Sequence, residues 1–201
     1  MFRRMARILF ALVVTILTAS AASVGEYAAK LAPLIDPAKL ATLRERGANP
    51  RIQKAVAILA EAEANKLDPG AVCTAAIERV KMQPAAGELT KAALLRNLDI
   101  ARKLGCLDDA GLADMRRGQS PTIKRGPYAG DELSVDHIIP RAVCPELDNV
   151  IANLELMPLK LNQKKNNSVG ERQVSHAEKL HAAGLLSREG LHGVKRASAK
   201  P

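Results

Sequence analysis

One segment of this chain of 201 residues carries side chains whose types and spacing could perform hydrolysis. Asp136 and His137 are adjacent at the end of an apolar run, and Asn162 follows in a polar stretch. Carboxylate and amide oxygens are suitable ligands for a hard divalent cation, and a neutral imidazole can take a proton from water. These residues predict a cation site with a base beside it.

The elements that must position these residues are a short hairpin and the helix after it. Residues 133–135 alternate apolar and polar side chains, and residues 154–157 predict a second short strand. Pro158 can open a helix that contains Asn162 and Lys165. This order of strand, turn, strand and helix would fold Asn162 back, so we expect the cation between the hairpin and the helix.

The segment resembles the HNH nuclease family of the ββα-metal superfamily. The family pattern has Asp-His near the first strand, Asn-Leu opening the second, and His or Asn on the helix nine residues later. Asn153 to Asn162 is nine residues here, and Lys165 stands where the family often has a lysine. The resemblance implies that Asp136 and Asn162 hold one Mg²⁺ or Mn²⁺ ion and that His137 is the general base.

The resemblance also implies hydrolysis of a phosphodiester, which leaves 5′-phosphate and 3′-hydroxyl ends. Asn153 would tie the connecting loop to the first strand and keep His137 aimed. Arg141 or Lys165 would add positive charge near the phosphate, next to the cation. For Arg141, Lys164 and Lys165, a solvated basic surface remains as good an interpretation as a phosphate-binding group.

The chain departs from the family pattern in its cysteines and in its loop. Many members carry paired Cys-x-x-Cys knuckles that bind a structural zinc ion. Cys144 is the only cysteine near the motif, so we expect no structural zinc. The frequent Gly-Gly of the loop is replaced by the turn-rich stretch 145–149. Asn162 suits Mg²⁺ better than a soft metal.

The first residues have the pattern of a signal peptide. Arginines at positions 3, 4 and 7 precede the apolar run Ile8–Leu17, and small residues follow, with cleavage expected after Ala21 or Ala22. A retained membrane anchor is the alternative, but this run is shorter than the roughly 20 residues that a span needs. We therefore expect an exported protein, periplasmic or secreted, without a stable membrane span after cleavage.

The charge balance favours a polyanionic partner. The formal net charge is +9, and removal of the three leader arginines lowers it to about +6. Tyr27 and Tyr128 are then the only aromatic residues, so stacking on splayed bases is not expected. We expect binding to nucleic acid, with DNA preferred and RNA as a further substrate, through phosphate contacts and largely without sequence specificity. The sequence identifies no immunity or inhibitor protein.

Helices are predicted for most of the chain before residue 118. Asp36-Pro37, Asn49-Pro50 and Asp68-Pro69 each offer an N-cap residue followed by Pro at the first helical position. Apolar residues recur at steps of three and four within residues 52–62 and 94–104. The charged fraction of 25% and the ordinary Gly and Pro counts exclude a collagen-like or wholly disordered chain.

The predicted fold class is α+β and mainly α. A helical lobe precedes a hairpin-helix nuclease module, and a further helix follows that module. The parts are residues 1–22 as signal peptide, 23–117 as helical lobe, 118–187 as HNH module with its trailing helix, and 188–201 as a basic flexible tail.

The three cysteines allow two interpretations. Disulfides persist in exported proteins, and an odd count predicts one pair and one free thiol. Cys73 and Cys106 lie in or beside helices of the same region, which favours them as the pair. In the alternative interpretation, all three are small buried hydrophobic residues.

A second hypothesis for the whole chain is a non-catalytic periplasmic binding or interaction protein. The helical lobe would then carry the function, and the nuclease-like segment would be a degenerate scaffold. A degenerate copy would lose Asp136, His137 or Asn162 first. All three are present, which favours the nuclease.

Overall fold

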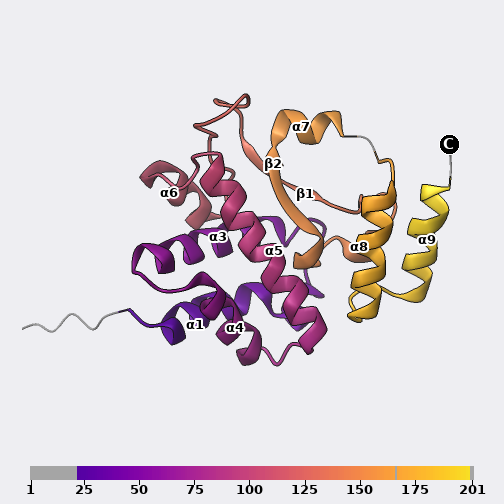
Figure 1. The fold of residues 1–201 in the computed structure, drawn as a ribbon, viewed down its shortest axis with the longest axis horizontal. Helices are drawn as coiled ribbons and strands as arrows, with labels where there is room; N and C mark the ends of the chain where they lie inside the picture. Colours follow the sequence, from indigo (N-terminus) through magenta and orange to yellow (C-terminus); the bar gives the residue numbers. More distant parts are fainter. Residues whose placement is uncertain (1–21, 166, 200–201) are drawn as a thin grey trace, which may run out of the picture.

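The computed structural model describes residues 22–165 and 167–199, which form a mainly helical fold with one two-stranded antiparallel sheet (Figure 1). Residues 1–21 of the predicted signal peptide lie outside the described residues. None of the helices within the described ranges is both long and apolar enough to cross a membrane.

The N-terminal lobe is built from helices, as the sequence predicts. Asp36 and Asp68 cap their helices through their side chains, and proline follows each of them. The third predicted cap is displaced by one residue, because Ala48 is the N-cap and Asn49 begins the helix. The helices are α1 (Val24–Ile35), α2 (Pro37–Leu40), α3 (Asn49–Ala64), α4 (Pro69–Arg79), α5 (Pro84–Lys103) and α6 (Asp109–Arg117).

The predicted order of strand, strand and helix is confirmed. Strand β1 (Leu133–His137) pairs antiparallel with β2 (Leu154–Pro158), and α7 (Leu159–Lys164) follows at once. The loop between the strands contains two short 3₁₀ helices, η1 (Pro145–Leu147) and η2 (Ile151–Asn153).

The hairpin and the lobe share one hydrophobic core. Leu133, Leu154 and Leu156 are buried among the apolar residues of the lobe helices. Asn97 of α5 is fully buried, donates to Leu154 O at 3.0 Å and accepts from Leu156 N at 2.7 Å. These hydrogen bonds satisfy two peptide groups on the edge of β2 that does not face β1. Buried peptide groups without a hydrogen bond would lower the stability of the fold. The predicted boundary at residue 118 therefore separates a helical segment from the segment with the strands, but it does not separate two hydrophobic cores.

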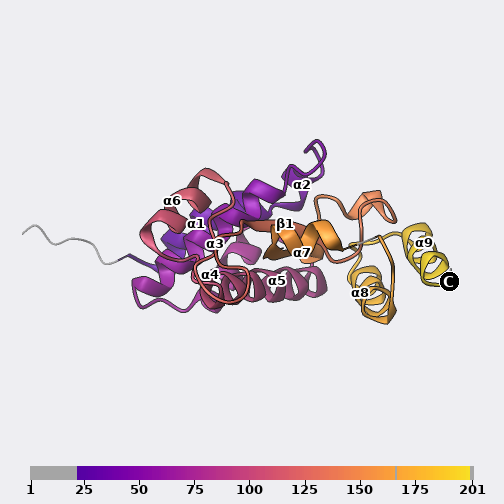
Figure 2. The ribbon, with the colours of Figure 1, turned by 90° about the horizontal axis from the view of Figure 1, so that it is seen from above.

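A second, smaller core lies under the C-terminal helices α8 (Glu171–Ala182) and α9 (Arg188–Ser198). Ala177 and Leu180 of α8 are buried there, as predicted. Figure 2 shows the lobe, the hairpin with α7, and the α8–α9 pair following one another along the longest axis.

The predicted flexible tail is wrong for residues 188–198, which form α9. Ser187 caps this helix by accepting from Gly190 N, and Val194 is fully buried against α8. Leu191 and Ala197, three residues to either side of Val194, pack on the same core. Three apolar residues on one face are enough to dock a helix, although basic residues dominate the segment.

The predicted Cys73–Cys106 disulfide is not formed. Cys73, Cys106 and Cys144 are all buried, free thiols. The Sγ of Cys106 contacts the carbonyl oxygens of Leu104 at 3.8 Å and Thr122 at 3.7 Å. Burial raises the pKa of the Cys73 thiol to about 12 and the pKa of Cys106 and Cys144 to about 11. The structure thus has the alternative arrangement, in which the cysteines are small buried residues.

Candidate functional site

His137 ends β1, and the turn after η1 holds its ring. Nε2 lies 3.0 Å from both the backbone oxygen and Oδ1 of Asp148. The two residues are 8% and 7% exposed, so this contact is shielded from water. A neutral ring that donates Nε2–H to Asp148 keeps its lone pair on Nδ1. Nδ1 is therefore the nitrogen that can act as a base.

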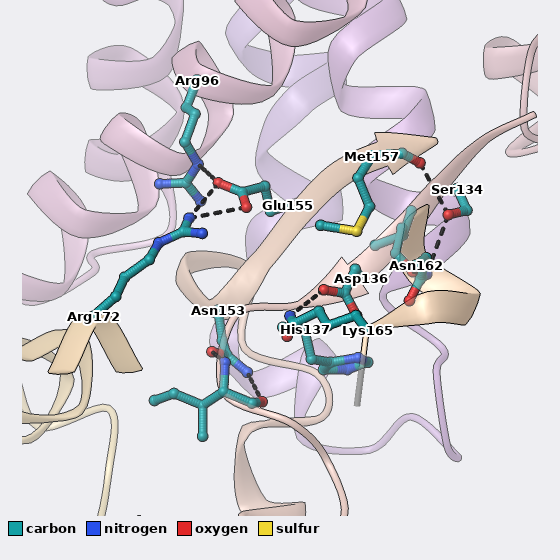
Figure 3. A network of polar contacts seen from close by, with 12 residues as sticks. Arg96, Ser134, Asp136, His137, Asn153, Glu155, Met157, Asn162, Lys165 and Arg172 are labelled. Carbon is teal, nitrogen blue, oxygen red and sulfur yellow. Dashed lines mark hydrogen bonds and ion pairs between the residues drawn. The ribbon is translucent and has the colours of Figure 1, made fainter. Parts of the chain in front are cut away.

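Asn153 joins the end of the connecting loop to the residues that follow β1 (Figure 3). Its side chain is fully buried, accepts from Ile139 N at 2.9 Å and donates to Ile139 O at 3.1 Å. Nδ2 also lies 3.5 Å from Leu147 O. Both polar atoms of the amide are thus used within the protein, and Asn153 is a positioning residue in this geometry.

The Asp136 carboxylate forms an ion pair with Lys165, the C-cap residue that follows α7 (Figure 3). Lys165 Nζ also donates to His137 O at 2.8 Å, which ties the end of α7 to the end of β1. Lys165 is thus engaged within the protein, and its role as a phosphate-binding group stays a prediction. Its ammonium neutralises the predicted metal ligand.

Asn162 of α7 is partly buried against the first half of β1. Its Nδ2 donates to Ser134 Oγ at 3.1 Å and lies 3.5 Å from Val135 O. These contacts orient the amide, so Oδ1 is the atom available as a metal ligand. The alternation of side chains along β1 explains why Asn162 lies near Asp136. Ser134, which contacts Asn162, and Asp136 are two residues apart on β1 and project to one face.

A polar cavity of about 280 Å³ brings most of the predicted residues together. Asn153 and Lys164 are not among the residues that form its wall, and Lys164 is exposed on α7. The wall consists of Arg46, Asp136, His137, Pro140, Arg141, Ala142, Asn162, Lys165 and Asn167.

Two arginines give this cavity an excess of positive charge. Arg141 forms an ion pair with Glu45, Nη1 to Oε2 at 2.7 Å, so its charge is partly compensated. Arg46 comes from the loop before α3 and was not predicted as a site residue. Its own sequence neighbourhood indicates only a turn, and only the fold brings it to the cavity.

Asp148 links this lobe loop to the imidazole. Its Oδ2 accepts from Arg46 N at 2.8 Å, while its Oδ1 faces His137. The Arg46 backbone has φ of 55°, a left-handed conformation that costs energy outside glycine. Asn149 holds the same loop by accepting from Ala48 N at 3.0 Å. The helical lobe thus takes part in holding His137, a role the sequence did not reveal.

The donor set fits a sparsely coordinated hard cation. Within the described residues, no three His, Cys, Asp or Glu side chains gather at one point. Asp136 and Asn162 offer two oxygen ligands, and Mg²⁺ in proteins commonly keeps several waters and uses one or two carboxylates plus substrate phosphate. Binding in this way requires Lys165 to release Asp136.

Lys165→Gln is accordingly expected to tighten Mn²⁺ binding about fivefold, because removing a competing ammonium is worth roughly 1 kcal/mol. Isothermal titration calorimetry with Mn²⁺ measures the change. Lys164→Gln is the matched control, since it removes the same charge from the neighbouring exposed residue. Equal affinities in the two variants would show that Lys165 does not compete with the metal.

Comparison of the chain with protein-family models, curated proteins and solved structures found no match. The resemblance to HNH nucleases therefore depends on the residues of the hairpin and helix themselves.

Proposed function

We propose that this chain is an exported, metal-dependent endonuclease that hydrolyses phosphodiester bonds of DNA, with RNA as a further substrate. One observation carries the proposal: Asp136, His137 and Asn162 lie on the wall of one polar cavity together with two arginines. A cation ligand, a base and groups that attract phosphate are the parts that phosphodiester hydrolysis requires.

In the proposed reaction, His137 Nδ1 takes a proton from a water molecule in the cavity. The water oxygen bonds to phosphorus, the bond from phosphorus to the 3′ oxygen breaks, and that oxygen takes a proton from solvent water to become a 3′-hydroxyl. Mg²⁺ or Mn²⁺ held by Asp136 and Asn162 would stabilise negative charge on the phosphate and the leaving oxygen. Arg46 and Arg141 attract the same phosphate, and Asp148 keeps the imidazole in the tautomer that has its lone pair on Nδ1.

Phosphate recognition explains the expected lack of sequence preference. Among the described residues of the cavity wall there is no Phe, Tyr or Trp, and the one imidazole, that of His137, is buried, so the wall offers little surface on which a base could stack. Guanidinium and ammonium groups contact the backbone that all sequences share. With the predicted signal peptide, we place this cleavage outside the cytoplasm, in the periplasm or the medium.

A plasmid-nicking assay with the purified chain tests the proposal. Mg²⁺ or Mn²⁺ is expected to convert supercoiled plasmid into nicked and then linear DNA, excess chelator to stop this, and added metal to restore it. Absence of cleavage with every divalent cation would overturn the nuclease function. Full activity in excess chelator would overturn the metal assignment alone.

One observation favours the second hypothesis of a non-catalytic binding protein. The ion pair between Lys165 and Asp136 gives the candidate metal ligand a neutralising partner within the chain. A scaffold that only binds polyanions would retain such a pair permanently. DNA binding without nicking in the same assay would support this second function.

A further inference from the structure

A second basic cavity lies at the other side of the hairpin end, between α5 and α8. Its volume is about 250 Å³. Its wall consists of Arg96, Ile138, Arg172, Ser175, His176 and Lys179. None of these residues has a role in the reaction proposed above.

Positive charge in this second cavity exceeds negative charge. Glu155 is the carboxylate that contacts both guanidinium groups: Arg96 Nε lies 3.2 Å from its Oε1, and Arg172 Nη2 lies 2.8 Å from the same atom. Lys179 has no ion-pair partner within the described residues. Two arginines therefore share one carboxylate, and Lys179 adds a third positive charge to the cavity wall.

The excess of positive charge affects the pKa of two groups at the cavity wall. Burial, with the positive charge of Arg96, Arg172 and Lys179, lowers the pKa of His176, whose Nε2 lies 3.1 Å from Ala152 O. Burial also lowers the pKa of Arg96, which Glu155 opposes in part and to which Arg172 adds. An anion in the cavity would relieve both groups.

The two arginines also have donors to spare. A guanidinium carries five N–H donors. Arg96 Nη2 donates to Leu154 O at 3.2 Å, and the buried Arg96 Nε lies near Glu155 without the alignment of a hydrogen bond. Arg172 uses Nη2 for Glu155 and is otherwise exposed. Such forks match the oxygens of a phosphate group.

The second cavity is adjacent to the first at the end of the hairpin, where β1 and β2 pair. Glu155 is directly opposite Asp136 in the strand register, and opposite residues project to the same face at neighbouring positions. Ile138 of the second cavity directly follows His137 of the first. Figure 3 shows Arg96, Glu155 and Arg172 on one side of the hairpin end, with Asp136 and Lys165 on the other.

We propose that the cavity formed by Arg96, Arg172 and Lys179 binds a second phosphate of the nucleic-acid strand that is cleaved at Asp136 and His137. This inference rests on the proposed nuclease function and extends it from the scissile bond to the strand around it. A diester without a second phosphate then gains nothing from this cavity.

The test compares two double variants with equal loss of charge. Arg172→Gln with Lys179→Gln changes the cavity, and both residues are exposed, so the fold is expected to survive. Lys30→Gln with Lys103→Gln is the control, because both lysines are exposed and each pairs only within its own helix. Duplex DNA binding is titrated against salt in chelator, where no cleavage is expected.

Loss of one phosphate contact reduces the salt slope of duplex binding by roughly 0.9. We expect this reduction in the cavity variant relative to the control variant. With Mg²⁺ present, the cavity variant is expected to lose DNA cleavage through a higher KM, while hydrolysis of bis(p-nitrophenyl) phosphate, which has a single phosphate, stays unchanged.

Equal salt slopes in the two double variants would overturn the second phosphate site. An equal loss on DNA and on bis(p-nitrophenyl) phosphate would also overturn it, because the residues would then act on the reacting centre. If the unmodified chain cleaves neither substrate, the nuclease function fails. The salt slopes still decide whether the cavity binds phosphate in that case.

Discussion

His137→Ala is expected to lower the turnover of DNA cleavage by roughly 10²- to 10⁴-fold, the usual consequence of losing a general base. The ring lies at the cavity wall, and its Nε2 contacts Asp148. The substitution removes Nδ1, the nitrogen that is expected to take the proton. Single-turnover cleavage of a duplex oligonucleotide in saturating Mg²⁺ measures this step without the contribution of product release.

His192→Ala is the control for this variant, because His192 is exposed on α9 and lies outside the cavity. Its turnover is expected to equal that of the unmodified chain. Circular dichroism checks that both variants are folded. Turnover of His137→Ala within about a factor of two of the unmodified chain would remove His137 from the mechanism, since a lost base costs far more.

Asn153→Ala is expected to lower the free energy of unfolding by roughly 2–6 kcal/mol. The substitution leaves Ile139 N–H and Ile139 O buried without partners, and each such group costs about 1–3 kcal/mol. That is a large fraction of the about 5–15 kcal/mol that holds a typical domain folded. Urea unfolding followed by circular dichroism measures the loss as a lower midpoint.

Two further variants separate this hydrogen-bond effect from the loss of an amide in general. Asn65→Ala removes an exposed amide that donates to Tyr27 Oη at 2.9 Å, and a change below about 1 kcal/mol is expected. Asn153→Asp retains the acceptor for Ile139 N but places a buried carboxylate oxygen against Ile139 O, so its midpoint is expected to be at least as low as that of Asn153→Ala. A midpoint for Asn153→Ala no lower than that of Asn65→Ala would contradict the buried role.

The elements around the site were predictable because their signals are local. Alternation over residues 133–135 and the apolar residues of 154–157 require only that one side of each strand is buried. Pro158 precedes α7 directly, and Asp36 and Asp68 cap helices through their own neighbouring N–H groups. Each of these effects acts over a few residues, so the chain order alone reveals it.

Two predictions, the flexible C-terminal tail and the Cys73–Cys106 disulfide, failed because a few long-range contacts decide the structure there. Val194 docks α9 although basic residues dominate the last segment, and the sequence shows no partner for it. The free thiol of Cys106 faces a carbonyl of the strand region instead of Cys73. Whether two helices bring their cysteines together depends on packing, which helix periodicity does not encode.

The sequence by itself determined which residues could do chemistry and which short elements carry them. Only the tertiary structure decided how they are held. Asp148 joins His137 to Arg46, which lies 102 residues before Asp148 in the chain, and Lys165 forms an ion pair with the carboxylate of Asp136. The same holds for the second cavity, where Arg96 of the lobe meets Arg172 across Glu155. The physical reason is that such contacts depend on how the lobe packs against the hairpin. That packing is set by the free-energy minimum of the whole chain, in which apolar surface is buried, and not by any local spacing.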